Sequence, residues 1–186
     1  SAEIENVTLS GSNAIDATGD AGDNVLTGNA GHNTLTGGGG ADTLSGGLGS
    51  DTLVGGTGDD VYEFGRGDGT DTIDNDGESA SDDVLRFGEN IAADQLWFDV
   101  TGNDLTVSVI GTDDSVRLLD WYDGTTDNRL DLELSDGAHL SAADIDVLVS
   151  AMATFTSPGD GASEYADAQH QRLDPLLAAY WQTPGS

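Results

Sequence analysis

Residues 19–63 consist of five consecutive nine-residue rows: GDAGDNVLT, GNAGHNTLT, GGGGADTLS, GGLGSDTLV and GGTGDDVYE. The fourth residue of every row is Gly, the sixth is Asn or Asp, and the eighth is large and apolar. These three columns are Gly22, Gly31, Gly40, Gly49 and Gly58; Asn24, Asn33, Asp42, Asp51 and Asp60; and Leu26, Leu35, Leu44, Leu53 and Tyr62. Such agreement is far beyond chance, so the rows are structural repeats.

Each column has a physical explanation. The apolar eighth residue predicts a very short strand with one side chain pointing inward, and stacked rows would bury a ladder of Leu. The glycines allow the positive φ angles of tight turns and let backbone carbonyls approach a shared centre without interference from a Cβ atom. Carbonyls and Asp carboxylates are the hard oxygen ligands that Ca²⁺ prefers, six to eight of them at about 2.3–2.6 Å. The rows therefore predict a solenoid with calcium in its turns.

Two rows, GGLGSDTLV and GGTGDDVYE, closely match the nonapeptide G-G-x-G-x-D-x-U-x, in which U is large and apolar. Residues 19–74 thus resemble the haemolysin-type, or RTX, calcium-binding repeats. The resemblance implies an all-β fold, a Ca²⁺-bound parallel β-roll in which each row is half a coil and an ion lies between rows two apart. It also implies the ligands. The first row supplies the carbonyls of residues two and four, the later row supplies the carbonyls of residues one and three, and each supplies the side chain of residue six.

This implied pattern gives four candidate ions. The site with two carboxylates combines Gly38, Gly40 and Asp42 with Gly55, Thr57 and Asp60. The next combines Gly47, Gly49 and Asp51 with Arg66, Asp68 and Asp71 of a longer row, FGRGDGTDTID, which follows a two-residue insertion. Two earlier sites combine Asp20, Gly22 and Asn24 with Gly37, Gly39 and Asp42, and Asn29, Gly31 and Asn33 with Gly46, Leu48 and Asp51. The same positions of the fifth row, Gly56, Gly58 and Asp60, could hold a further ion with Asp83 across an irregular stretch.

The two early sites depart from the family pattern because Asn replaces Asp on one side. An Asn oxygen can coordinate calcium, but the lost charge weakens affinity. Alternatively, Asn24 and Asn33 only cap turns by hydrogen bonding to backbone, as in metal-free solenoids. Folding is therefore expected to begin near the carboxylate-rich end and to spread toward the N-terminus. We interpret His32, at the variable fifth position, as a solvated residue and not a ligand.

The composition supports a cation as the partner. The 186 residues include 27 Gly and 35 acidic residues against five basic ones, all Arg, for a formal net charge of −30. Nucleic acid and anionic membrane surfaces are therefore poor partners for this chain. The lack of Cys excludes disulfides and thiolate zinc sites. No apolar run has the length of a membrane span, and residues 1–10 lack the basic and apolar parts of a signal peptide.

The flanking segments predict covers for the roll. Residues 1–18, with Val7, Leu9 and Ile15, are expected to form a metal-free row over the first Leu. Residues 75–140 resemble the haemolysin-type calcium-binding-related segment and predict an antiparallel β cap. Its expected strands are Val84–Phe87, Leu96–Val100, Leu105–Ile110, Val116–Tyr122 and Leu130–Leu134. The apolar surface of the cap would come from Trp97, Phe98, Trp121 and Tyr122, which could alternatively line a ligand groove.

Residues 141–186 predict a helical tail. Ser141 and Asp144 form a capping-box pattern ahead of an apolar face made by Ile145, Leu148, Val149 and Met152. A second helix is expected to start at Asp174 and Pro175 and to run through Leu176, Leu177, Tyr180 and Trp181. The segments LVSAMATF and LDPLLAAYWQ, with a Pro-Gly linker between them, resemble the uncleaved C-terminal region of proteins exported by type I secretion systems.

The expected function is that of a calcium-binding module in a secreted bacterial protein. One buried Leu per nine residues contributes less than the entropy lost in ordering them, so the rows should fold only with calcium. The type I exporter, through residues 141–186, and upstream domains of the same polypeptide are the expected partners, and the location is extracellular or at the cell surface. One alternative is a calcium-dependent adhesion or polysaccharide-binding module, and another is the non-catalytic domain of a secreted hydrolase, epimerase or toxin. Catalysis is not expected here, because His32, His139 and His170 lie in a repeat turn, a strand-end turn and a terminal linker, with no nucleophile motif nearby.

Overall fold

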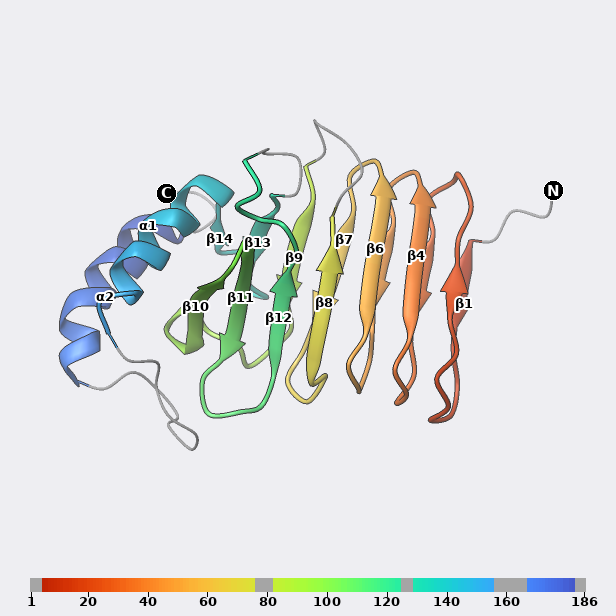
Figure 1. Cartoon of the computed structure of the whole chain (residues 1–186), viewed down its shortest axis with the longest axis horizontal. Coiled ribbons are helices and arrows are strands. Elements are labelled where there is room, and N and C mark those ends of the chain that lie inside the picture. The colour runs from red at the N-terminus through yellow and green to blue at the C-terminus, as the bar shows by residue number, and fades with distance from the viewer. Residues whose placement is uncertain (1–4, 76–81, 125–128, 156–166, 183–186) are drawn as a thin grey trace.

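The computed structural model describes residues 5–75, 82–124, 129–155 and 167–182. Short strands stack along the long axis of the molecule, and two helices cover the end farthest from the N-terminus (Figure 1). One sheet contains, in spatial order, β1 (Asn6–Thr8), β3 (Val25–Thr27), β5 (Thr43–Ser45), β7 (Val61–Phe64), β9 (Val84–Phe87), β13 (Asp131–Glu133) and β14 (His139–Leu140). The other contains β10 (Leu96–Thr101), β11 (Asp104–Val109), β12 (Ser115–Leu118), β8 (Thr70–Asp74), β6 (Thr52–Thr57), β4 (Thr34–Gly39) and β2 (Ala17–Thr18).

The rows alternate between the two sheets, as a parallel β-roll requires. Within each sheet the paired strands of the repeat are parallel, and residues of the eighth column lie opposite one another. Leu26 pairs with Leu44 and Leu44 with Tyr62 in one sheet, and Leu35 pairs with Leu53 in the other. All five side chains are buried. The predicted ladder and the all-β roll are therefore confirmed.

The first coil is built differently from the prediction in one respect. Val7 lies opposite Leu26, as a covering strand requires. Ile15, however, is 42% exposed, and Ala17 pairs with Leu35 in the ladder instead. The reason is the phase of the repeat: counted back from Gly19, Ile15 falls at the sixth position of its row, in the turn, and Ala17 at the eighth, in the strand.

The segment after residue 74 contains the five expected strands, but only part of their pairing is antiparallel. Strands β10, β11 and β12 form an antiparallel meander, and β13 pairs antiparallel with β14. By contrast, β9 and β13 continue the first sheet in parallel, and β12 pairs in parallel with β8. The roll thus extends beyond its repeats. The strand expected to reach Tyr122 ends at Leu118, because Asp120 takes a positive φ of 51°.

The cap is filled by aromatic side chains. Trp97, Phe98 and Trp121 are all buried, and Tyr122 packs against the same core. These side chains pack into the end of the roll, and Trp97 and Phe98 also line a pocket with Met152 and Phe155. Their burial shows where the apolar surface of the cap is used.

Helix α1 (Ala142–Met152) begins as predicted. The Ser141 side chain accepts a hydrogen bond from the Asp144 N–H at 3.3 Å and donates to its carboxylate at 2.6 Å. Ile145, Leu148 and Met152 are fully buried, and the Phe98 N–H lies 3.3 Å from the Met152 sulfur. The helix is therefore packed onto the cap.

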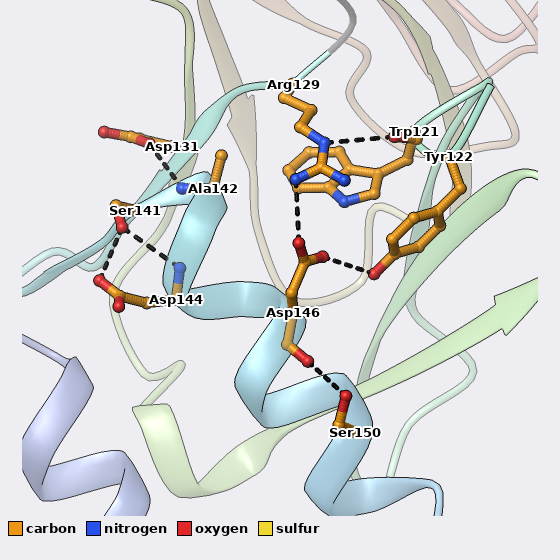
Figure 2. Close-up of polar contacts among 9 residues, drawn as sticks. All are labelled: Trp121, Tyr122, Arg129, Asp131, Ser141, Ala142, Asp144, Asp146 and Ser150. Atoms are coloured by element: carbon orange, nitrogen blue, oxygen red, sulfur yellow. Dashed lines mark hydrogen bonds and ion pairs between the residues drawn. The ribbon is translucent and has the colours of Figure 1, made fainter. Parts of the chain in front are cut away.

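An arginine on the loop before β13 holds α1 in place (Figure 2). Arg129 lies against the rings of Trp121 and Tyr122, with its guanidinium carbon 5.4 Å from each ring centroid. The same guanidinium contacts Asp146 of α1 at 3.0 Å, and the Tyr122 hydroxyl donates to the other Asp146 oxygen at 2.8 Å. One carboxylate thus fastens the helix to two parts of the cap.

The predicted start of the second helix is wrong. Helix α2 (Asp167–Tyr180) begins before Asp174 and carries Pro175 in its interior, so His170 lies in a helix and not in a linker. A proline there removes one hydrogen bond. Leu173 and Leu177, four residues apart on either side of Pro175, are both buried, and this packing keeps the helix continuous. Neither helix, within the described ranges, is long and apolar enough to cross a membrane.

Candidate metal sites in the turns

The sixth residues of the rows form a hydrogen-bonded ladder along each edge of the roll. On one edge the Oδ1 atoms of Asp42, Asp60 and Asp83 accept from the backbone N–H groups of Asn24, Asp42 and Asp60, at 2.7, 2.8 and 2.7 Å. On the other edge Asp51 accepts from the Asn33 N–H at 2.7 Å, and Asp71 from the Asp51 N–H at 2.9 Å. Each carboxylate therefore uses one oxygen to accept a hydrogen bond from the preceding coil.

The second oxygen of three of these carboxylates has no hydrogen-bond donor. The Oδ2 atoms of Asp42, Asp51 and Asp71 are buried and unpaired, and the three residues are only 1%, 2% and 1% exposed. A buried anionic oxygen without a donor is strongly unfavourable unless a cation compensates it. The three atoms therefore mark places in the turns where positive charge is required.

The acidities of these groups agree with that requirement. Burial raises the pKa of Asp42 and Asp51 above the usual value, and it raises the pKa of Asp60 and Asp71 to about 7. Neighbouring carboxylates add to the effect, Asp83 and Asp42 at Asp60, and Asp51 at Asp71. In the absence of metal, protons are the only available substitute for a cation.

The sign of the pH dependence follows from these shifts. Asp60 and Asp71 have a pKa of about 7 in the metal-free roll, whereas an Asp side chain in the unfolded chain has its ordinary pKa of 3.8. Between these pH values the folded form binds more protons than the unfolded form. The free energy of unfolding of the metal-free roll therefore decreases as the pH rises through this window.

The turn glycines bring carbonyl oxygens into the same edges. Gly56 has a φ of 111°, and an ideal Cβ on it would lie 2.1 Å from the Gly38 oxygen. Gly58 has a φ of 117°, with the Gly40 oxygen 2.2 Å from its ideal Cβ. Successive coils thus stack backbone on backbone. Any side chain at these positions would separate the coils and displace the carbonyls of the second and fourth residues.

The atoms around the first glycine of a row show which oxygens lie close together in a turn. An ideal Cβ on Gly37 would lie 2.2 Å from Asp42 Oδ2 and 2.6 Å from the Gly55 oxygen. Both atoms belong to the same predicted site. Gly19 shows the equivalent pair for its site, with Asn24 Oδ1 at 1.9 Å and the Gly37 oxygen at 2.3 Å. The third such pair, at Gly28, is the Gly46 oxygen at 1.9 Å and Asn33 Oδ1 at 2.6 Å.

The donor set of these spaces is almost entirely oxygen from the backbone. Among the residues placed by the structure, no three His, Asp or Glu side chains converge in the manner of a side-chain metal site. An ion in the turns would therefore take most of its ligands from carbonyls, with one carboxylate or amide oxygen per row. Such a set of hard oxygens suits Ca²⁺ better than zinc or another softer metal.

In the two Asn-bearing rows, the Asn side chains form the turn-capping hydrogen bonds to backbone that were the alternative to calcium coordination. Asn24 Oδ1 accepts from the Asp20 N–H, and Asn33 Oδ1 accepts from the Asn29 N–H, both at 2.8 Å. Asn33 Nδ2 also donates to the Ile15 oxygen at 2.7 Å, which ties the first coil to the roll. Both Asn side chains thus cap turns, whereas the unpaired carboxylate oxygens lie closer to the cap.

The longer row keeps the predicted phase. Gly69 bridges to Gly49, which places Arg66 and Asp68 at the first and third positions. The Arg66 side chain turns away, since its Nε donates to the Asn90 oxygen at 2.7 Å. Only the backbone oxygen of Arg66 could face the site. The Asp68 carboxylate accepts from the Gly65 N–H at 2.7 Å and shapes the inserted turn.

Sequence reasoning missed Asp114. Its carboxylate is buried and accepts from the N–H groups of Gly67 and Gly69, at 2.9 and 3.2 Å. No repeat signal could have identified it, because it lies in a turn of the cap more than forty residues downstream. The parallel pairing of β12 with β8 brings it to the end of this edge.

Comparison with known families agrees with this geometry. The family model of the RTX calcium-binding nonapeptide repeat, which spans four copies, matches residues 18–53 and 37–71. The family model of the haemolysin-type calcium binding protein related domain matches residues 104–144, from β11 into α1. The nonapeptide match covers the turns with the unpaired carboxylates, and such rolls are non-catalytic structural modules. Residues 18–71 are therefore RTX calcium-binding repeats, and they identify the β-roll as a calcium-binding module of a secreted protein.

Proposed function

We propose that the roll binds about four Ca²⁺ ions, one between each pair of rows that lie two apart in residues 19–74. The side-chain ligands are those of the sixth column together with Asp71, and the remaining ligands are the carbonyls of the first four residues of each row. The observation that carries the proposal is the unpaired, buried Oδ2 of Asp42, Asp51 and Asp71. Calcium supplies the positive charge that these oxygens lack.

Calcium then acts as the switch for folding. A chain with a net charge of −30 must bring its carboxylates together to form the roll, which is unfavourable without cations. An ion at about a hundred times its dissociation constant stabilises the folded form by about 2.7 kcal/mol, so about four ions supply roughly 10 kcal/mol. That is the stability of an entire ordinary domain.

The switch fits a role in export. In calcium-poor cytoplasm the chain remains unfolded, residues 141–186 engage a type I exporter, and the roll folds in the calcium-rich exterior. The folded roll then stabilises or anchors an upstream region of the same polypeptide. Helix α1 belongs to this segment, and in the folded form it buries Ile145, Leu148 and Met152 against the cap.

A calcium titration followed by circular dichroism tests the switch. We expect an unfolded chain in excess chelator and cooperative formation of β structure between sub-millimolar and millimolar Ca²⁺. The substitution Asp51→Asn keeps the shape of a side chain shared by two proposed sites, and it should raise the calcium midpoint. Asp99→Asn, at an exposed position of the cap, removes the same charge and should leave the midpoint unchanged. A chain that is fully folded in chelator would contradict the proposal.

The export role needs a separate test, because deleting residues 141–186 also removes the buried face of α1. Residues 141–186 are therefore fused to an unrelated unfolded passenger in cells that carry a type I exporter. We expect the passenger in the medium with the segment and in the cytoplasm without it. If deletion from the full chain leaves secretion unchanged, the segment is not the signal.

A further inference from the structure

We call the space in a turn between the first residue of a row and its sixth side chain a slot. The slot between Gly55 and Asp60 differs from those that begin at Gly19, Gly28 and Gly37. At Gly19, Gly28 and Gly37 the space beside the sixth side chain is shared with the carbonyl of the first residue two rows later. At Gly55 an ideal Cβ would lie 2.1 Å from Asp60 Oδ2 and 2.6 Å from the Tyr62 hydroxyl. A phenol oxygen therefore lies where the rows that begin at Gly19, Gly28 and Gly37 have a carbonyl.

Tyr62 reaches this position because it replaces Leu in the eighth column. Its side chain is fully buried in the ladder, and the hydroxyl extends beyond the space that a Leu fills. There the hydroxyl accepts from the Gly55 N–H at 3.0 Å and donates to Asn75 Oδ1 at 2.6 Å. The hydroxyl is thus fixed at the slot by one donor and one acceptor.

The chain of hydrogen bonds continues to the last carboxylate of this edge. Asn75 Nδ2 donates to Asp83 Oδ2 at 2.8 Å, and Asp83 Oδ1 accepts from the Asp60 N–H at 2.7 Å. Both Asn75 and Asp83 are buried. Asp83 therefore differs from Asp42, whose Oδ2 is unpaired, because the protein itself provides donors to both of its oxygens.

We propose that a Tyr62–Asn75–Asp83 hydrogen-bond relay fills the slot after Asp60 in place of calcium, and that it ends the row of ions on this edge. The relay deepens the proposed function and rests on it, since it says which slot of a calcium-binding roll holds no calcium. An amide N–H pointing at a carboxylate supplies the positive partner that an ion supplies elsewhere. Its N–H cannot coordinate a cation. The last coil is therefore closed without metal.

An exchange of the amide and the carboxylate tests the relay. In Asn75→Asp the donor to Asp83 is lost, and in Asp83→Asn two amide groups face each other. Each single variant should raise the calcium midpoint of folding by about 1.5- to 3.5-fold, the cost of one buried unpaired group divided among about four ions. The double variant restores a donor, an acceptor and the total charge, and the midpoint should return to near that of the unmodified chain.

Bound calcium is counted by equilibrium dialysis of the same proteins. The double variant should bind as many ions as the unmodified chain, whereas the control Asp42→Asn should bind fewer. If the double variant loses one ion relative to the unmodified chain, Asp83 is a calcium ligand and the relay is wrong. A double variant that folds no better than the singles would equally overturn it. If the unmodified chain binds no calcium at all, the proposed function fails instead.

Discussion

Replacing Gly56 by Ala should remove one calcium ion from the roll. The ideal Cβ lies 2.1 Å from the Gly38 oxygen, which belongs to the backbone of the neighbouring coil and to the proposed site of Asp42 and Asp60. The matched control is Gly11→Ala, because Gly11 also has a positive φ, 88° against 111°, but nothing lies within 4 Å of its ideal Cβ. The two variants share the conformational penalty and differ in the contact.

The expected magnitudes are well separated. The positive φ costs about 1–2 kcal/mol in either variant. In Gly56→Ala the coils must also part by more than about 1 Å to reach a normal nonbonded distance. Calcium–oxygen distances vary by only about 0.3 Å, so the Gly38 carbonyl leaves the ion. Losing an ion held at about a hundred times its dissociation constant costs about 2.7 kcal/mol more. The total is about 4–5 kcal/mol for Gly56→Ala and about 1–2 kcal/mol for Gly11→Ala.

Urea denaturation at saturating calcium gives both free energies of unfolding, and equilibrium dialysis gives the number of bound ions. Gly56→Ala should bind one ion fewer than Gly11→Ala. If the two variants have free energies of unfolding within about 1 kcal/mol of each other and bind equal numbers of ions, the carbonyl of the second row position is not a ligand and the coils are not held at the spacing described.

Three further outcomes are expected. Asp60→Ala should raise the calcium midpoint of folding more than Asn24→Ala, since Asp60 contributes a carboxylate to the proposed ion and an acceptor to the preceding coil. Equal midpoints would contradict the expected weaker calcium affinity of the Asn-bearing sites. In excess chelator, lowering the pH from about 7.5 to about 5 should increase the β structure seen by circular dichroism. The reason is that burial raises the pKa of Asp60 and Asp71 to about 7, so their protonation favours the folded form. A less folded chain at the lower pH would show that reasoning to be wrong. Arg129→Ala should destabilise the cap in calcium by about 1 kcal/mol, the modest value of a partly exposed pair with Asp146, as measured by urea denaturation, and no change would mean that the rings alone hold the helix.

The repeat could be predicted in detail because its information is local. A period of nine residues defines the columns, and the spacing of eighteen residues between rows on one edge explains why Asp42 accepts from the Asn24 N–H. Leu26 and Leu44 meet for the same reason. Each of these contacts repeats a rule that a single row already contains.

The prediction fails where the spacing of eighteen residues between rows on one edge changes. Asp71 lies 20 residues after Asp51, and Asp83 lies 23 residues after Asp60, so insertions hide the continuation of the ladders. Asp114 has no counterpart in any row. The parallel strands β9, β12 and β13 are joined by long connections, and local alternation of side chains does not distinguish parallel from antiparallel partners.

The error in α2 has a different origin. Asp174 followed by Pro175 is a good local signal for a helix start. The helix continues through it because Leu173 is completely buried on the N-terminal side of the proline. Tertiary packing outweighed the local preference there, and no pattern within a few residues of Pro175 reports that packing.

The carboxylate ladders also make the roll directional. In the five rows of residues 19–63, every sixth-position N–H is capped by the coil that follows it, as Asn24 is capped by Asp42 and Asn33 by Asp51. A coil therefore depends on its successor for an acceptor, whereas the successor keeps its own acceptor when the earlier coil is absent. Units of eighteen residues could thus be gained or lost at the N-terminal side without uncapping any sixth-position amide in the rest of the roll. Rolls of different length could in this way share one unchanged cap.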